Sequence, residues 1–227
     1  MQKLMVAIFV IFVIGCAEKP DDPVLTSTDA APDQYKVEFE NDYVRVISVH
    51  YGPGESSAMH SHEPFVGVTL TGAQSVFTNL DGTSETRPES FPGDLIDGDL
   101  SPHAVRSIST GDQHSIFVEI KQPYPAVTAV VPNIVEAAPS IAKVELEKPG
   151  IRVVRIKNLA NNETPLHSHR AGVSVALTDM QVAITSPDGE VSQATRPAGD
   201  VAWEEERAHS GKNLSDQPTE MVLFELL

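Results

Sequence analysis

Short runs in which apolar and polar residues alternate recur along most of the chain. Residues 44–49 (VRVISV) and 151–156 (IRVVRI) are rich in β-branched side chains and broadly follow this alternation. A period of two residues is typical of β-strands that bury one face. Turns rich in glycine, proline and asparagine separate the runs, and no segment beyond the N-terminal region carries a long apolar stripe with the 3.6-residue period of a helix. The pattern predicts an all-β fold.

The same pattern occurs twice. When the chain is displaced by 107 positions against itself, its first half aligns with its second, and one residue of slippage extends the match. The matching segments are residues 36–40 with 143–147, 44–46 with 151–153, 60–62 with 167–169, 92–94 with 198–200, and His103 with His209. This indicates a tandem duplication. We expect repeat 1 at residues 35–122, a proline-rich linker at 123–140 and repeat 2 at 141–227, and the apolar linker segment 127–131 is expected to form a strand against one of the sheets.

Residues 1–15 have the features of an export signal. Lys3 gives a positive start, and the apolar core at 6–14 is too short for a permanent membrane-spanning helix. Residues 13–16 (VIGC) resemble a bacterial lipobox, which implies lipidation of Cys16; a plain signal peptide that contains a chance cysteine is the alternative. We therefore expect an exported body, anchored by lipid to the cell membrane or outer membrane and facing the periplasm or the exterior. Residues 16–34, rich in Asp, Pro, Thr, Ser and Ala, predict a flexible tether.

The net charge of the chain limits the classes of partner that it can bind. The formal net charge is −16, and it becomes −17 once residues 1–15 and their single lysine are removed. An acidic surface excludes nucleic acid, whose phosphates need basic residues, and disfavours electrostatic docking on anionic lipid. Cys16 is the only cysteine, so the lipidated protein would have neither a disulfide nor a thiol nucleophile. A small-molecule ligand and the membrane anchor are the expected partners, and the oligomeric state stays open.

Six of the eight histidines fall into two matching sets. Within a strand, His60 and His62 would point to the same face, about 6 to 7 Å apart, and His103 from a later strand would complete the set. Three imidazoles suit a divalent ion of iron, zinc, nickel, copper or manganese and leave coordination positions open for a ligand. The candidate metal ligands are His60, His62 and His103 in repeat 1 and His167, His169 and His209 in repeat 2. The spacing leaves open which ion binds and whether one or both repeats bind it.

These motifs resemble those of the cupin superfamily, and two copies in one chain resemble a bicupin. The matching residues of repeat 1 are Gly54, His60, His62 and Gly72 for the first cupin motif, and Pro92, Gly93, Asp94 and His103 for the second. Repeat 2 also keeps the terminal asparagine of the second motif, Asn213, where repeat 1 has Ser107. The resemblance implies two jelly-roll barrels of the double-stranded β-helix type, each with a site at its mouth.

One departure from the cupin pattern affects the chemistry. The glutamate that usually follows the second histidine by four or five residues is missing, because residues 66–67 are Val-Gly and residues 173–174 are Val-Ser. Glu63 follows His62 directly and would point to the opposite face of the strand. Cupins with three histidines and no glutamate include dioxygenases, so the resemblance implies a dioxygenase-type oxidoreductase that acts on a small organic molecule.

Two other functions stay open at this point. A non-enzymatic cupin would bind a small ligand, or serve as a scaffold, without a catalytic metal. A metal-dependent isomerase or lyase is disfavoured, because the motif strands carry no evident acid or base besides the imidazoles themselves. The sequence names no substrate.

Several polar or aromatic residues outside the motifs have two interpretations. An arginine at the barrel mouth would suit a carboxylate ligand, whereas one beside a strand is expected at the exposed rim. The arginines concerned are Arg45, Arg87, Arg152 and Arg196. We expect His50 at a solvent-facing or edge position, Trp203 in the core or a pocket wall, and Glu204-Glu205-Glu206 either in a solvated loop or as acceptors for an imidazole.

Overall fold

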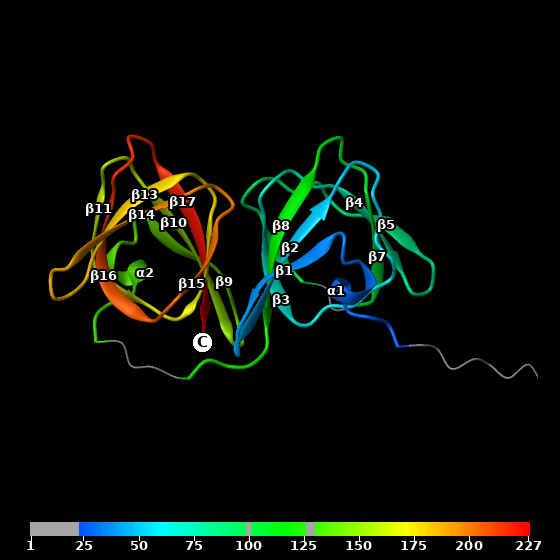
Figure 1. Ribbon diagram of the computed structural model, residues 1–227, viewed down its shortest axis with the longest axis horizontal. Coiled ribbons are helices and arrows are strands. Elements are labelled where there is room, and N and C mark those ends of the chain that lie inside the picture. The colour runs from blue at the N-terminus through cyan, green and yellow to red at the C-terminus, as the bar shows by residue number, and fades with distance from the viewer. Residues whose placement is uncertain (1–22, 99–100, 126–129) are drawn as a thin grey trace, which may run out of the picture.

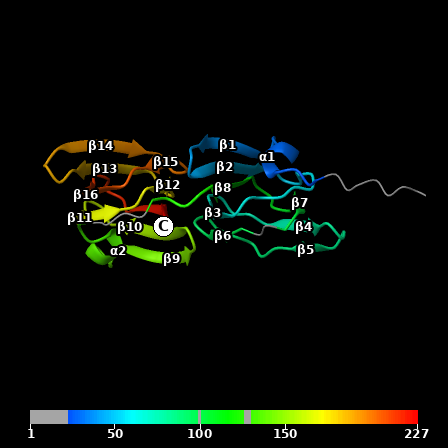
Figure 2. The same ribbon diagram turned by 90° about the horizontal axis from the view of Figure 1, so that it is seen from below.

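The computed structural model describes residues 23–98, 101–125 and 130–227, which form two β-barrels side by side along the long axis of the molecule (Figures 1 and 2). Each barrel contains one repeat, and its paired strands are antiparallel. This arrangement confirms the predicted all-β chain with two tandem barrels. No helix in the described segments is long and apolar enough to cross a membrane. The predicted signal peptide, Cys16, tether residues 17–22 and most of segment 127–131 lie outside the described residues.

The first barrel consists of two sheets. A five-stranded sheet has the order β1-β2-β8-β3-β6, and a three-stranded sheet has the order β5-β4-β7. The strands are β1 (Tyr35–Glu40), β2 (Val44–Tyr51), β3 (Phe65–Thr69), β4 (Ser75–Asn79), β5 (Ser84–Thr86), β6 (Leu95–Asp97), β7 (His103–Ser107) and β8 (Gln113–Ile120).

The second barrel repeats this plan with a longer second sheet. Its five-stranded sheet has the order β15-β12-β17-β10-β9, and its four-stranded sheet has the order β11-β16-β13-β14. The strands are β9 (Ala142–Lys148), β10 (Ile151–Asn158), β11 (Glu163–His169), β12 (Gly172–Ala176), β13 (Met180–Thr185), β14 (Val191–Arg196), β15 (Val201–Glu204), β16 (Arg207–Asn213) and β17 (Thr219–Leu226).

Each repeat starts earlier than its sequence suggests, because a short helix precedes its first strand. The helices α1 (Ser27–Ala30) and α2 (Ile134–Ala137) lie 107 positions apart, and each carries a buried residue, Ser27 and Ile134. Parallel bridges also pair Thr26 with Ser61 and Asn133 with Ser168. The segments expected as a tether to residue 34 and as a linker to residue 140 therefore each contain a short helix, and backbone hydrogen bonds tie both segments to their barrels.

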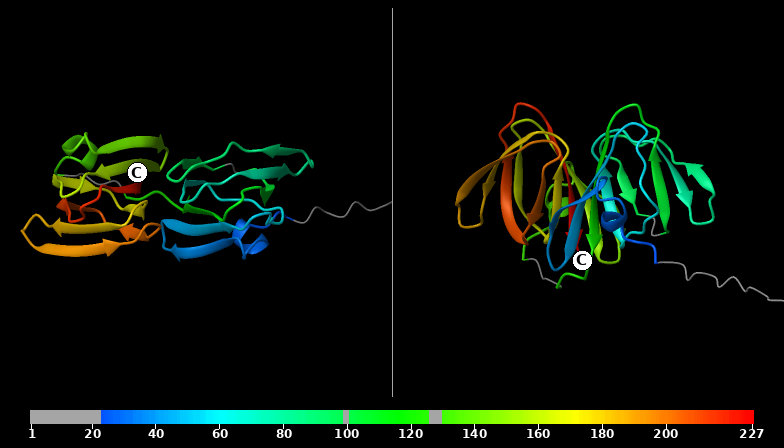
Figure 3. Two further views of the ribbon diagram at one scale, coloured as in Figure 1. Left: turned by 90° about the horizontal axis from the view of Figure 1, so that it is seen from above. Right: turned by 45° about the vertical axis from the view of Figure 1, so that its right-hand side comes forward.

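The two barrels share a hydrophobic core, and they stay adjacent when the molecule is turned (Figure 3). Its buried members are Val44, Val46, Val66, Val68, Ile116 and Val118 from repeat 1 and Ile151, Val153, Val173, Val175, Val222, Phe224 and Leu226 from repeat 2. On β2, Ile47 and Val49 belong instead to a cluster inside the first barrel. Both faces of β2 are thus buried, which explains why residues 44–49 alternate only broadly.

A buried ion pair occupies the same place in each repeat. Arg152 Nη2 lies 2.6 Å from Glu225 Oε2, and Arg45 Nη1 lies 3.5 Å from Glu119 Oε2. The Glu225 side chain is 0% exposed and that of Glu119 is 4% exposed, whereas Arg45 keeps 29% of its side chain in solvent. Arg45 and Arg152 therefore neutralise carboxylates of their own barrels.

Glu119 is expected to make the stability of the protein depend on pH. Burial raises the pKa of Glu119 from 4.5 to about 7, although Arg45 opposes this shift. The folded state then holds a proton that the unfolded state releases, so the free energy of unfolding falls as the pH rises from about 4.5 to about 7, by at most about 3 kcal/mol. Replacing Glu119 with glutamine should remove this slope, as measured by urea unfolding at pH 5 and pH 8.

Wild type and Glu119→Gln must be compared with each other at each pH, because other groups also titrate in this range. Burial lowers the pKa of His60 and of His114 to about 4, so these imidazoles withdraw stability as the pH falls below about 6.5. That trend is opposite in sign and common to both proteins. An unchanged difference between wild type and Glu119→Gln at the two pH values would contradict the prediction.

Candidate functional site

The first histidine set is assembled by backbone pairing inside the first barrel. His60 and His103, the first residue of β7, form an isolated antiparallel bridge with two backbone hydrogen bonds of 2.9 Å. His62 follows two residues after His60, on the same side as the sequence predicted. The segment around His60 is a bridge rather than a full strand. The fold thus fixes the third histidine opposite the first.

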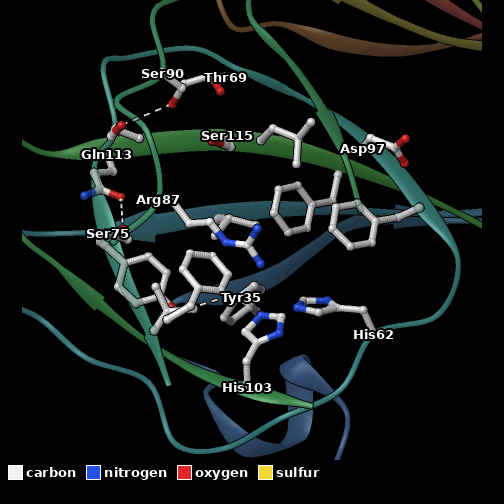
Figure 4. Close-up of a pocket in the computed structure, with 18 of the residues that line it drawn as sticks. Tyr35, His62, Thr69, Ser75, Arg87, Ser90, Asp97, His103, Gln113 and Ser115 are labelled. Atoms are coloured by element: carbon white, nitrogen blue, oxygen red, sulfur yellow. Dashed lines mark hydrogen bonds between the residues drawn. The ribbon is translucent and has the colours of Figure 1, made fainter. Parts of the chain in front are cut away.

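The three imidazoles meet in a geometry that suits a metal ion. One ring nitrogen from each of His60, His62 and His103 lies within 4.8 Å of the others, and all three residues are buried. Their ring centroids are 4.9 Å, 4.9 Å and 5.3 Å apart. In Figure 4, His62 and His103 converge on the same end of the cavity. Among the residues that the structure describes, this is the one cluster of three histidine, cysteine, aspartate or glutamate residues whose ligand atoms lie this close together.

Hydrogen bonds orient two of these rings. His60 Nδ1 donates to the carbonyl oxygen of Ala58 at 2.8 Å, and His103 Nδ1 donates to that of Ser101 at 2.7 Å. This tautomer leaves the lone pair on Nε2, and the buried Nε2 of His60 has no hydrogen-bond partner. Burial, with a smaller contribution from His103, lowers the pKa of His60 to about 4. The ring is therefore neutral near pH 7, as a metal ligand must be.

A cavity of about 300 Å³ opens beside the triad. Its walls include several aromatic side chains, and the ring of Tyr35 lies 4.9 Å from that of His60. The Tyr35 hydroxyl accepts a hydrogen bond of 3.0 Å from Tyr51. Arg87 extends into the cavity toward the histidines, with its guanidinium 5.0 Å above the Phe77 ring and 3.0 Å from a Glu85 carboxylate oxygen (Figure 4). The cavity therefore combines mainly apolar walls with the cation of Arg87, the carboxylate of Asp97 and neutral polar groups such as Gln113.

Comparison with known proteins establishes the fold. No family model and no curated protein matches this sequence. The structure aligns over 86% of its length with AerE from Microcystis aeruginosa, covering 97% of that chain at 13% identity with a TM-score of 0.58. It also aligns over 88% of its length with the Lactobacillus farciminis oxalate decarboxylase formate complex, covering 84% of that chain at 12% identity with a TM-score of 0.54. A third alignment, over 82% of its length, is with Bacillus subtilis oxalate decarboxylase, which has Mn(II) centres; it covers 69% of that chain at 12% identity with a TM-score of 0.53. The chain has the cupin fold.

The site of the first cupin barrel contains three histidines without a carboxylate. Val66 points into the core shared by the two barrels. A Cβ atom on Gly67 would lie 2.7 Å from the backbone oxygen of Ile116, so a glutamate does not fit there. No aspartate or glutamate of the described segments joins the triad. The three-histidine set predicted from the sequence is therefore the set that the first barrel brings together.

The second cupin barrel brings His209 as close to the other two rings as the first barrel brings His103, but the three ligand nitrogens do not converge in the same way. His167 on β11 pairs with His209 on β16, and the ring of His209 lies 4.5 Å from that of His167 and 5.2 Å from that of His169. This set does not bring three ligand nitrogens within 4.8 Å of one another. It borders a cavity of about 370 Å³, whose wall has Asn158 at the position of Tyr51.

Some of the other candidate residues line a cavity wall, and others hold neighbouring segments of the chain in place. Trp203 lines the second cavity, as expected, and its Nε1 donates to Glu205 at 2.7 Å. Arg196 is held by Asp200, Ser174 and Glu204, so its role is structural. His50 is exposed, as expected for a solvent-facing histidine, and it stacks on His114 at 3.8 Å on the interior strand β2. The tyrosines of the first cavity and Arg207 of the second barrel were not predicted as site residues, because no sequence motif includes them.

Proposed function

We propose that the first cupin barrel binds one divalent metal ion through His60, His62 and His103 and presents it to a small anionic organic molecule. The observation that carries this proposal is the convergence of three buried imidazoles, one of which keeps an unpartnered Nε2 in the site. A buried nitrogen lone pair without a partner is costly unless a ligand takes it. A metal ion bound to this nitrogen would satisfy it.

The donor set is consistent with the dioxygenase-type oxidation proposed from the sequence. Three neutral imidazoles leave the full charge of a divalent ion uncompensated and leave coordination positions open, so a bound ion would supply Lewis-acid or redox chemistry to an anionic ligand. The walls of the cavity, which include Phe65, Phe77 and Phe117, would exclude water from that position.

Two side chains of the cavity would hold the ligand. Arg87 would pair with a carboxylate or a similar anionic group, because its guanidinium offers a planar set of donors. Tyr51 donates to Tyr35, so the Tyr35 hydroxyl can direct its own hydrogen into the cavity. The ligand would thus be oriented between a cation at one side and the triad at the other.

Metal content tests the proposal directly. The full-length protein, purified in detergent, would be loaded with Zn²⁺ or Co²⁺, passed through a desalting column and assayed by mass spectrometry of the metal. We expect about one equivalent to be retained, together with the visible absorption of imidazole-bound Co²⁺. Less than about a tenth of an equivalent would overturn the proposal and favour a cupin that binds its ligand without metal.

We also propose that the barrels act outside the cytoplasm, anchored through a lipid on Cys16. This rests on the short apolar run and the VIGC sequence that ends at Cys16. Metabolic labelling with a fatty-acid analogue tests it: label should enter the wild type and be lost in Cys16→Ser. Labelling that is equal in both proteins would contradict the proposed anchor.

A further inference from the structure

An arginine of the second barrel occupies the second histidine set. The Nε of Arg207, at the start of β16, donates to Nε2 of His169 at 3.4 Å. The other ring nitrogen of His169, Nδ1, donates to the carbonyl oxygen of Arg170 at 3.0 Å. Both nitrogens of His169 are therefore engaged by the protein itself, and its one lone pair, on Nε2, accepts a hydrogen bond from Arg207.

Neighbouring acids hold Arg207 in this position. Arg207 Nη2 lies 3.0 Å from Glu204 Oε2, and Glu204 is itself fixed by a 2.7 Å hydrogen bond from Ser174 and by Arg196 at 3.4 Å. A guanidinium keeps its charge at every accessible pH. A divalent ion bound to His169 would lie within a few ångströms of that charge, where like charges repel most strongly.

The first barrel shows what the arginine replaces. The position two residues before the third histidine is Ser101 in repeat 1 and Arg207 in repeat 2. The Ser101 carbonyl oxygen accepts the hydrogen bond from His103 Nδ1 at 2.7 Å. In the second barrel, the buried Nδ1 of His209 has no such partner. The two sets thus share their histidines but differ at this position in both charge and ring orientation.

We propose that Arg207 keeps the second barrel free of metal, and that His167, His169 and His209 form a latent metal site which opens when the guanidinium is removed. The protein would then be functionally asymmetric, with metal chemistry in one barrel and a metal-free cavity in the other. The comparison with the first barrel rests on the proposed function, whereas the contacts around His169 do not.

The test counts metal equivalents with the first barrel silenced. In the full-length protein with His60→Ala and His62→Ala, we expect no retained Zn²⁺. Adding Arg207→Ser should restore about one equivalent, and adding His169→Ala to that variant should remove it again. Arg170→Ser is the matched control, because it removes a neighbouring arginine whose Nε donates to the carbonyl oxygen of Leu226 instead. It should restore nothing.

The possible outcomes separate this inference from the proposed function. Zn²⁺ retained by the silenced protein before any change at Arg207 would overturn the inference, as would an equal gain in Arg170→Ser. If Arg207→Ser does not fold, as judged by circular dichroism, Arg207→Gln keeps a donor for Glu204 without the charge. No gain in a folded variant of either kind would overturn the inference. Failure of the wild type to bind metal, with a gain in Arg207→Ser, would overturn only the function proposed for the first barrel.

Discussion

Replacing His60 with alanine is expected to weaken metal binding by the first barrel about 100-fold or more. His60 is 0% exposed, its Nδ1 is tied to Ala58, and its Nε2 has no other partner. The backbone bridge to His103 would survive the change, so the remaining histidines should keep their places while one ligand is lost. Competition between the protein and a coloured chelator for Zn²⁺ would measure the change in affinity.

The equivalent change in the second barrel provides the matched control. His167 occupies the same place as His60, donates its Nδ1 to Pro165 at 2.8 Å and is likewise buried. Removing His167 should leave the affinity and the stoichiometry unchanged, because Arg207 already engages His169 in that barrel. Equal losses from His60→Ala and His167→Ala would show that both barrels bind metal, and no loss from His60→Ala would place the ion elsewhere.

The difference between the two barrels marks the limit of what the sequence could predict. The repeated His-Ser-His motif and the third histidine in register identified the duplication and the triad, because strand pairing turns a fixed spacing into proximity. The same spacing indicated a second, equal site. Only the folded chain brings Arg207 to His169, since these residues lie 38 positions apart and belong to two paired strands.

The average composition of a segment did not predict which of its residues are buried. Residues 16–34 are polar on average, yet Ser27 and Ala31 are buried. Similarly, α1 (STDA) and α2 (IVEA) have different hydrophobicity but the same place in the fold, so the alignment of the repeats stopped short of them. A helix of four residues has no period to detect. Its position depends on the barrel behind it.

The roles of the arginines were equally hard to predict from the sequence. Arg45, Arg87, Arg152 and Arg196 all lie beside strands in the sequence, and each could have faced a ligand or the rim. The structure gives them three roles: Arg87 enters the cavity, Arg196 braces a loop, and the aligned pair neutralises buried carboxylates. The partners of that pair are more than 70 positions away, which no local pattern reveals.

Replacing Arg152 with methionine is expected to destabilise the protein by about 3 to 5 kcal/mol. The change preserves much of the side-chain volume but leaves the fully buried carboxylate of Glu225 without its cation. Among the described residues, the backbone N–H of Arg170 at 3.2 Å is the donor that remains. A buried charge that loses its partner bears the full cost of desolvation. Urea unfolding at pH 7, followed by fluorescence, measures the loss.

Two comparisons separate this cause from the loss of packing. Arg45→Met removes the equivalent cation in the first barrel, where the arginine is more exposed and lies farther from its carboxylate, so its cost should be clearly smaller. Adding Glu225→Met to Arg152→Met should recover much of the stability, because an apolar pair of similar volume needs no counter-charge. A deficit that persists in the double variant would mean that Arg152 acts through its packing rather than its charge.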